Sequence, residues 1–239
     1  MRTVVRYARK RYRLERREIR VSAERNSVLH SWCIQAQWDA PTVIGGAGAR
    51  LHLEDGRSIL DMSSLAECSN LGHQHPRVVA AIREQAERLC FVTNAWGAAP
   101  RGALASRLLE LGGFAGGRVF FTLGGADANE HAVKIARQAT GKPRGVVIAR
   151  DRSYHGATYL AMALSGDART RTQVDPDALG VSHVEPPYAY RCPFGSRDDA
   201  ECGERAARAV ADRIDHFGAE RVAAVIIEPL VQGAGGMKM

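Results

Sequence analysis

The stretch that decides the fold is RVFFTLGGADANEHAVKIA, residues 118–136. An apolar run, two glycines and an amphipathic segment follow one another, which predicts a strand over 118–122, a turn at Gly124-Gly125 and a helix beyond. The first N–H groups of a helix lack internal partners and carry the positive end of its dipole, so this junction can bind a phosphate. A tight connection without any ligand would have the same pattern, and the junction alone does not separate the two interpretations.

The dinucleotide fingerprint G-x-G-x-x-G does not fit this turn. Starting from Gly124, it requires glycines at positions 126 and 129, which hold Ala126 and Asn129. Asp151 follows the next apolar run, where a ribose-binding acid would stand. Without the glycines, we interpret Asp151 as an ordinary polar residue at a strand end.

The residues downstream predict an α/β fold with a mostly parallel sheet and flanking helices. Continuous apolar runs at 145–149 and 223–227 are typical of strands buried on both faces of a parallel sheet. A short strand is predicted at 181–184 and a helix over 206–217. Residues 118–149 then form one βαβ unit.

The residues upstream predict smaller elements. Alternating apolar and polar residues over 50–62, centred on Asp55-Gly56, predict a hairpin. Helices are predicted to begin at Pro76 and Pro100, since proline is tolerated in a first helical turn. The first helix has one apolar stripe, and the second is expected to turn its leucines inward; these residues are Val79, Ile82, Ala86 and Leu89 in the first helix and Leu104, Leu108 and Leu111 in the second.

Composition indicates a globular protein of 239 residues, 45% of them hydrophobic, enough for one large domain or a domain with a lobe. No apolar run has the length of a membrane span or of a signal-peptide core, so we expect a cytoplasmic protein. The five cysteines are scattered without a C-x-x-C pair, which favours reduced thiols over zinc or a redox centre.

The net charge of +7 lies in a basic N-terminal arm. Residues 1–25 hold ten basic and three acidic side chains, so the remainder of the chain is neutral. Such an arm could bind nucleic acid or an anionic surface. We favour a solvated extension or a start site read too far upstream, because the neutral body of the chain argues against a nucleic-acid partner.

Three chemically distinct groups follow the predicted strands: Gly124-Gly125-Ala126, then Tyr154-His155, then Glu228. Ligands of parallel α/β sheets bind beyond the carboxyl ends of the strands, so these groups are expected in one crevice. A phosphate cradle, an aromatic plate and a carboxylate suit a flat, phosphorylated aromatic cofactor. Each residue taken alone has an ordinary structural explanation. Tyr154 could be a surface aromatic, His155 a hydrogen-bonded loop residue, and Glu228 a helix cap or a salt-bridge partner.

At this point the sequence resembles the class III aminotransferases, which are pyridoxal-phosphate enzymes of fold type I. Four blocks stand in the family's order: NLGHQHP (70–76), FFTLGGADANE (120–130), RSYHGAT (152–158) and IIEP (226–229). The likeness runs from about Ser31 to the last residue and implies the N-terminal part of that fold, with an incomplete sheet. It implies an arm (1–25), part of the small domain (26–95) and the first part of the cofactor-binding domain (96–239).

Carried over by position, the resemblance implies that the backbone N–H groups of Gly125 and Ala126 hold the phosphate. Family members often have Ser or Thr where this chain has Ala126. Tyr154 would stack on the pyridine ring with His155 beside it, and Glu228 would lie near the ring. Trp32 resembles a position that lines the substrate pocket. The histidines of the HQHP block (73–76) imply no metal, because a turn into a helix explains them.

The motifs GGADANE (124–130), SGD (165–167) and YRCPF (190–194) are similar to those of the family branch that uses pyruvate and ω-amino donors. The resemblance therefore implies transfer of an amino group from a donor such as β-alanine or taurine to a 2-oxo acid such as pyruvate.

The resemblance also implies two residues that this chain does not supply. The family's Schiff-base lysine and the aspartate that binds the pyridine nitrogen both lie beyond the Glu228-Pro229 block. The four lysines, Lys10, Lys134, Lys142 and Lys238, do not match that position. We expect a truncated chain that is inactive alone, with a first strand lacking a neighbour and a doubtful family homodimer. A non-catalytic module that binds pyridoxal phosphate or pairs with a full-length relative is the alternative.

Overall fold

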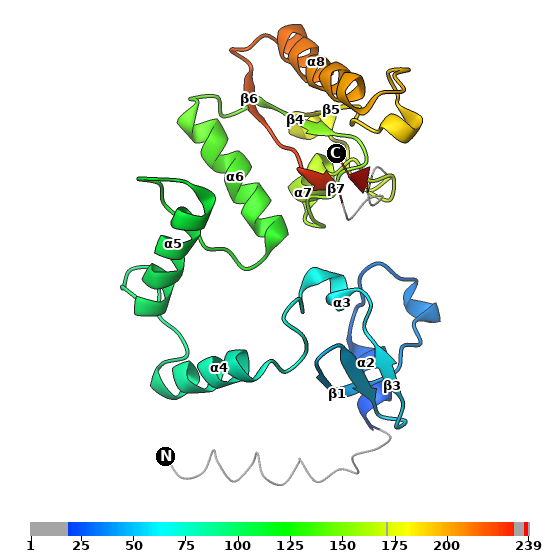
Figure 1. The fold of residues 1–239 in the computed structure, drawn as a ribbon, viewed down its shortest axis with the longest axis vertical. Helices are drawn as coiled ribbons and strands as arrows, with labels where there is room; N and C mark the ends of the chain where they lie inside the picture. Colours follow the sequence, from blue (N-terminus) through cyan, green and yellow to red (C-terminus); the bar gives the residue numbers. More distant parts are fainter. Residues whose placement is uncertain (1–18, 171, 232–236, 239) are drawn as a thin grey trace. The chain divides into compact units, whose positions relative to one another are not determined.

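The computed structural model describes residues 19–170, 172–231 and 237–238 (Figure 1). Residues 1–18, which include most of the basic arm and Lys10, lie outside the described residues. The chain divides into two compact units, Met1–Gly102 and Ala103–Met239, and each is described by itself. The domain boundaries expected from the sequence stay predictions.

The first unit contains a three-stranded antiparallel sheet in the order β1-β2-β3. Its strands are β1 (Val43–Ala47), β2 (Arg50–Leu53) and β3 (Ser58–Leu60). The hairpin predicted around Asp55-Gly56 is confirmed: Gly56 has a φ of 88°, and Asp55 accepts hydrogen bonds from the backbone and guanidinium of Arg57. Strand β1, with its Gly45-Gly46 pair, was not predicted.

A buried contact between His73 and Asp61 organises the loop before the next helix. His73 Nε2 lies 2.8 Å from Asp61 Oδ2, and the backbone of His73 pairs with Gly48. Although burial raises the pKa of the Asp61 carboxyl, hydrogen bonds from the backbone of Ser63, the ring of His73 and the backbone of Leu65 together lower it. The first histidine of the HQHP block therefore has a structural role, holding residues 70–75 against the sheet.

The helices of the first unit are α2 (Ile19–Ser27), the single turn α3 (Ser64–Glu67) and α4 (Pro76–Arg88), with a 3-10 turn η1 (Gln35–Gln37). Helix α5 (Ala99–Gly112) begins in the first unit and continues into the second. The predicted starts of α4 and α5 are confirmed to within a residue. The prediction that the leucines of α5 face inward is wrong, since Leu111 is 67% exposed; Ile82, on the apolar stripe of α4, is 63% exposed. An amphipathic pattern predicts a helix and its apolar face, but not the surface that covers that face. Within the described residues nothing buries these two stripes.

The second unit is built on a parallel sheet in the order β5-β4-β6. Its strands are β4 (Val146–Arg150), β5 (Val181–Val184) and β6 (Val222–Val225). All five residues of the central strand β4 are buried, as its continuous apolar sequence predicts. Strand β6 lies at an edge and is half-buried to exposed, so the prediction that it is buried on both faces is wrong. A short antiparallel pair follows, β7 (Leu230–Val231) with β8 (Met237–Lys238).

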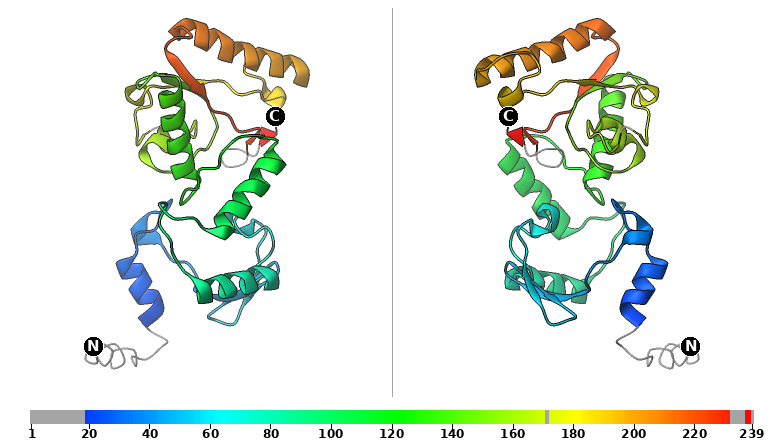
Figure 2. Two further views of the ribbon diagram at one scale, coloured as in Figure 1. Left: turned by 90° about the vertical axis from the view of Figure 1, so that its left-hand side faces the viewer. Right: turned by 90° about the vertical axis from the view of Figure 1, so that its right-hand side faces the viewer.

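Helices cover both faces of this sheet (Figures 1 and 2). Helix α8 (Asp199–Phe217) packs on β4 and β5, whereas α6 (Gly125–Ala139) and α7 (Tyr159–Leu164) pack together on the opposite face. Crossovers between parallel strands are right-handed, and β4 to β5 runs in the opposite direction from β5 to β6, so α7 and α8 must lie on opposite faces. The 3-10 turns η2 (Asp177–Leu179) and η3 (Ala189–Arg191) complete the unit.

The core lies between this sheet and the α6–α7 layer. It consists of Val133, Val147, Ala149, Ala163, Leu164, Val174 and Val181. The small residues Val133, Ala161 and Ala163 of α6 and α7 allow these helices to pack closely on the sheet.

The predicted strand at 118–122 does not form. Residues 117–122 have no regular structure, and Phe120 and Leu123 are 60% and 102% exposed. The ring of Phe120 lies back on α6, 4.7 Å from the His131 ring and 5.9 Å from Lys134 Nζ. A strand requires a neighbour to receive its hydrogen bonds, and no described strand pairs with this segment. The βαβ unit predicted over 118–149 is therefore present only from its helix onward.

Candidate cofactor-binding site

The first turn of α6 is open. Its N-cap, Gly124, is extended and makes no side-chain capping hydrogen bond. A Cβ placed on Gly124 or Gly125 would meet no atom within 4 Å. The Asp127 carboxylate is turned to the side, where it accepts the Leu123 N–H at 3.2 Å and lies 3.4 Å from His131 Nε2. The positive end of the α6 dipole thus faces open space at the two glycines.

The loop after β4 lies directly against this helix end. Asn129 Nδ2 donates to the carbonyl oxygen of His155 at 2.7 Å. Gly156 has a φ of 128°, and a Cβ there would stand 2.5 Å from the Cβ of Ala126. Only glycine allows this approach, so Gly156 fixes the Tyr154-His155 segment beside Ala126.

Two buried serines hold the inside of the same loop. Ser153 Oγ donates to the Arg150 carbonyl at 2.6 Å and accepts from the Gly166 N–H at 3.1 Å. Ser165 Oγ accepts from the His155 N–H at 2.8 Å and donates to Ala161. Ser165 belongs to the SGD block of the sequence, and Ser153 to the RSYHGAT block. Both hydroxyls are buried, so their hydrogen bonds fix the loop from its inner side.

Glu228 joins this group from the segment after β6. Its Oε1 accepts the Tyr154 N–H at 2.5 Å, and its carbonyl oxygen accepts from the Arg150 guanidinium. Burial lowers the pKa of Arg150, and the charge of Glu228 partly restores it. The structure therefore brings together the α6 N-terminus, Tyr154-His155 and Glu228, the three groups expected at the carboxyl ends of the strands.

His155 is held as a neutral ring. Burial lowers the pKa of its imidazole to about 4, and the charges of His183 and Arg150 act in the same direction. Its Nε2 is buried and has no hydrogen-bond partner among the described residues. A buried polar atom without a partner is costly, so it marks a place where a bound group can supply one. The open glycines and this atom both fit a phosphorylated, hydrogen-bonding ligand.

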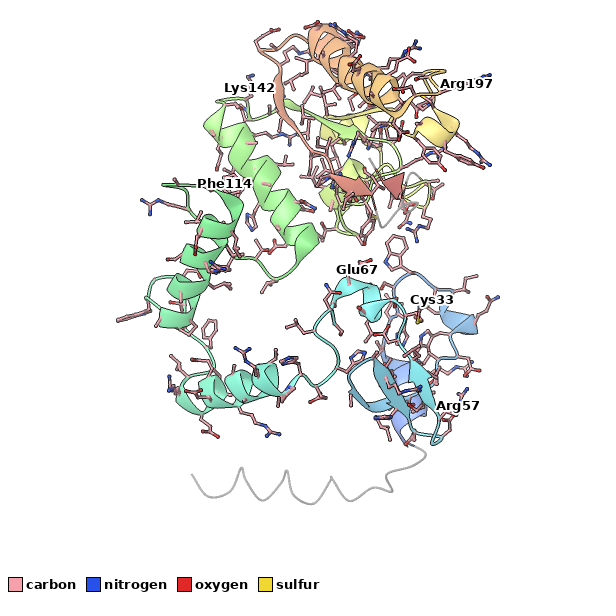
Figure 3. All side chains as sticks on the ribbon, viewed as in Figure 1. Cys33, Arg57, Glu67, Phe114, Lys142 and Arg197 are labelled. Atoms are coloured by element: carbon pink, nitrogen blue, oxygen red, sulfur yellow. The ribbon has the colours of Figure 1, made fainter. Side chains whose placement is uncertain are left out.

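Trp32, the other residue singled out as a binding residue, belongs to the first unit, where it is 50% exposed and has a φ of 61°. Lys142 Nζ donates to the carbonyls of Ala219 and Val222, each at 2.8 Å, at the amino ends of β4 and β6 (Figure 3). Tyr154 lies at the other end of these strands, after the carboxyl end of β4. Lys134 lies over Phe120, and the side chain of Lys238 is outside the described residues.

Comparison with known proteins decides the family. The class III aminotransferase profile matches residues 35–239. The chain belongs to the class III aminotransferases. Among the curated members, it is 35% identical to an acetylornithine aminotransferase of Myxococcus xanthus, covering 81% of this chain and 43% of that protein. It is 31% identical to a hypotaurine/taurine–pyruvate aminotransferase of Paracoccus denitrificans, covering 90% and 48%.

Among class III aminotransferases of known structure, taurine:2-oxoglutarate aminotransferase from Bifidobacterium kashiwanohense was solved with pyridoxal phosphate and glutamate. It matches with a TM-score of 0.80 and 35% identity, over 90% of this chain and 48% of that chain. The fold is thus fold type I, as the four sequence blocks imply, and the cofactor of the family is pyridoxal phosphate. The chain spans about half the length of the relatives it matches. Among the described residues, no helix is long and apolar enough to cross a membrane.

Proposed function

We propose that this chain carries the phosphate- and ring-holding part of an aminotransferase site for pyridoxal phosphate. The observation that carries the proposal is the meeting of three groups at one sheet edge: the open first turn of α6, the Tyr154-His155 loop and Glu228. Family membership supports the cofactor, and the residues present fit it. When bound, pyridoxal phosphate supplies an electron sink for amino-group transfer.

The roles of the residues follow from their surroundings. The N–H groups of Gly125 and Ala126 would donate to the phosphate, with help from the helix dipole. Because Ala126 has no hydroxyl, the cup holds the phosphate by backbone groups at this position. Tyr154 would provide the aromatic plate. Glu228 acts as a positioning residue, since its carboxylate holds the backbone N–H of Tyr154.

His155 would offer its neutral ring to the bound group. At neutral pH the imidazole carries no charge, because its pKa is about 4. Its Nε2 can therefore donate or accept one hydrogen bond according to its tautomer, without bringing a second positive charge beside Arg150.

We infer an ω-amino donor and a 2-oxo acid acceptor. Two of the relatives are named for taurine, whose amine stands at the opposite end from its acid group, and their acceptors, pyruvate and 2-oxoglutarate, are both 2-oxo acids. The acetylornithine relative is equally similar, so taurine or β-alanine as donor and pyruvate as acceptor are the finer part of the proposal. Trp32 is proposed to line the substrate pocket, and the cytoplasm is the proposed location.

We further propose that this chain alone does not transaminate. Of the lysines in the described residues, Lys142 is engaged at the opposite sheet edge and Lys134 lies over Phe120 on α6. The alternative function, a non-catalytic module that binds the cofactor or pairs with a full-length relative, is favoured by the same observation. Purified chain with pyridoxal phosphate, β-alanine and pyruvate should form no alanine; measurable turnover would contradict this proposal.

The experiment that tests the site is a calorimetric titration with pyridoxamine phosphate and, in parallel, with pyridoxamine. Neither ligand has an aldehyde, so neither can react with surface lysines. Hydrogen bonds to a charged group contribute about 1.5 to 3 kcal/mol each, so the phosphate should improve affinity at least about tenfold. Equal affinities would show that the α6 turn does not hold a phosphate.

A further inference from the structure

Two cysteines far from the proposed cofactor site meet in the second unit. Cys192 follows the 3-10 turn η3, and Cys202 lies in the first turns of α8. Their sulfur atoms are 2.7 Å apart. Cys202 is fully buried, whereas Cys192 is half-buried. The sequence gives no C-x-x-C signal here, because nine residues separate the two.

Hydrogen bonds fix the loop between the two cysteines to the first turns of α8. Asp198 caps α8 by accepting the Glu201 N–H at 2.9 Å, and Ser196 Oγ donates to the Glu201 carboxylate at 2.6 Å. Arg205 donates to the Phe194 carbonyl at 2.5 Å. On the buried side, the N–H of Tyr188 donates to Cys202 Sγ at 3.3 Å. These hydrogen bonds keep the two sulfur atoms next to each other in the folded chain. Less conformational entropy is therefore lost when a disulfide bond forms between them.

The surroundings make the two thiols chemically unequal. Burial raises the pKa of Cys202, and the hydrogen bond between the two thiols raises it further. At Cys192 burial also works toward a higher pKa, but the hydrogen bond between the thiols, backbone N–H groups of Phe194 and Ser196 and the charge of Arg205 together lower it. Cys192 is thus the more accessible and more readily ionised of the two.

We propose that Cys192 and Cys202 are a redox site that forms a reversible disulfide by exchange with a low-molecular-weight disulfide. The Cys192 thiolate attacks one sulfur of the small disulfide, which forms a mixed disulfide and releases one thiolate. The Cys202 thiol then loses its proton and attacks Cys192 Sγ, which releases the second small thiol. The protein pair loses two electrons and two protons, and the small disulfide is reduced to two thiols.

The test uses the full 239-residue chain with the three exposed cysteines, Cys33, Cys68 and Cys90, replaced by serine. Cys33 is labelled in Figure 3. The chain is equilibrated in buffers of reduced and oxidised glutathione, quenched with an alkylating agent, and examined by intact mass and peptide mapping. We expect an internal Cys192–Cys202 disulfide, with an equilibrium constant at least about tenfold larger in buffer than in concentrated urea.

Two variants separate the roles of the pair. In C202A, Cys192 should retain a glutathione adduct, because no second thiol displaces it. In C192S, the buried Cys202 should stay unmodified in buffer. Stable glutathione adducts on Cys192 with Cys202 present, or equal constants in buffer and urea, would overturn the proposal.

Discussion

At the scale of single residues, the proposed phosphate cup depends on Gly124, the N-cap of α6, and on Gly125, its first residue. Because a Cβ on Gly125 meets nothing within 4 Å, a larger side chain can enter the space without disturbing the fold. We predict that Gly125→Leu lowers the affinity for pyridoxamine phosphate at least about tenfold, with little change in the urea midpoint. Gly203 of α8 is also open at its Cβ, so Gly203→Leu is the matched control and should bind as the parent chain does. If Gly125→Leu bound pyridoxamine phosphate as tightly as the parent chain, the first turn of α6 would not be the phosphate site.

His155 makes stability depend on pH. Its folded-state pKa of about 4 lies below the ordinary histidine value of 6.5, so as pH falls the unfolded chain takes the proton first. The contribution of His155 to the free energy of unfolding is complete above pH 6.5. It should be lost as the pH falls toward 4, by at most about 3 kcal/mol. Urea unfolding at several pH values should show this loss in the parent chain and a smaller one in His155→Gln. The exposed His216→Gln is the control; identical slopes in all three would contradict a neutral buried His155.

Residue types and chain order were enough to predict Gly125, Ala126, Tyr154, His155 and Glu228 as one group. Their partners were not predictable. The Asn129–His155 bond joins residues 26 positions apart, and the Tyr154–Glu228 bond joins residues 74 apart. Such bonds depend on how strands and helices pack, which local sequence does not encode. The contact between Cys192 and Cys202 could not be predicted for the same reason.

At the scale of elements, burial separates the successful predictions from the failed ones. Strand β4 was predictable because a continuous apolar run is buried on both sides. The run at 118–122 has the same character, yet it has no neighbouring strand among the described residues and stays irregular. A strand is a property of a pair, so sequence alone predicts only a segment that is able to pair.

The contact between α6 and the β4 loop depends on Asn129. We predict that Asn129→Ala lowers the free energy of unfolding by about 1 to 2 kcal/mol, because the buried carbonyl of His155 loses its donor. The measurement is urea unfolding followed by circular dichroism. Gln138→Ala, an exposed residue on the same helix, should have little effect. Equal effects of the two substitutions would show that Asn129 does not hold the loop.

At the scale of the whole molecule, the described part of the chain exposes many apolar side chains. In the second unit, the segment before α6 is the clearest case, with Phe120 60% and Leu123 102% exposed. Exposed apolar segments that can pair as strands favour self-association. We predict concentration-dependent association of the chain in sedimentation velocity, reduced in Leu123→Lys. Lysine substitution of Thr140, a polar residue at the far end of α6, is the control; an unchanged distribution in Leu123→Lys would exclude this segment as the contact.

The most direct test of the proposed site is its location. Chain labelled with ¹⁵N-glycine and ¹⁵N-alanine should be titrated with pyridoxamine phosphate while backbone amide resonances are followed by NMR. We predict the largest shifts at Gly125 and Ala126, a smaller one at Gly156, and none at Gly203. Saturable binding that leaves Gly125 and Ala126 unshifted would contradict the account.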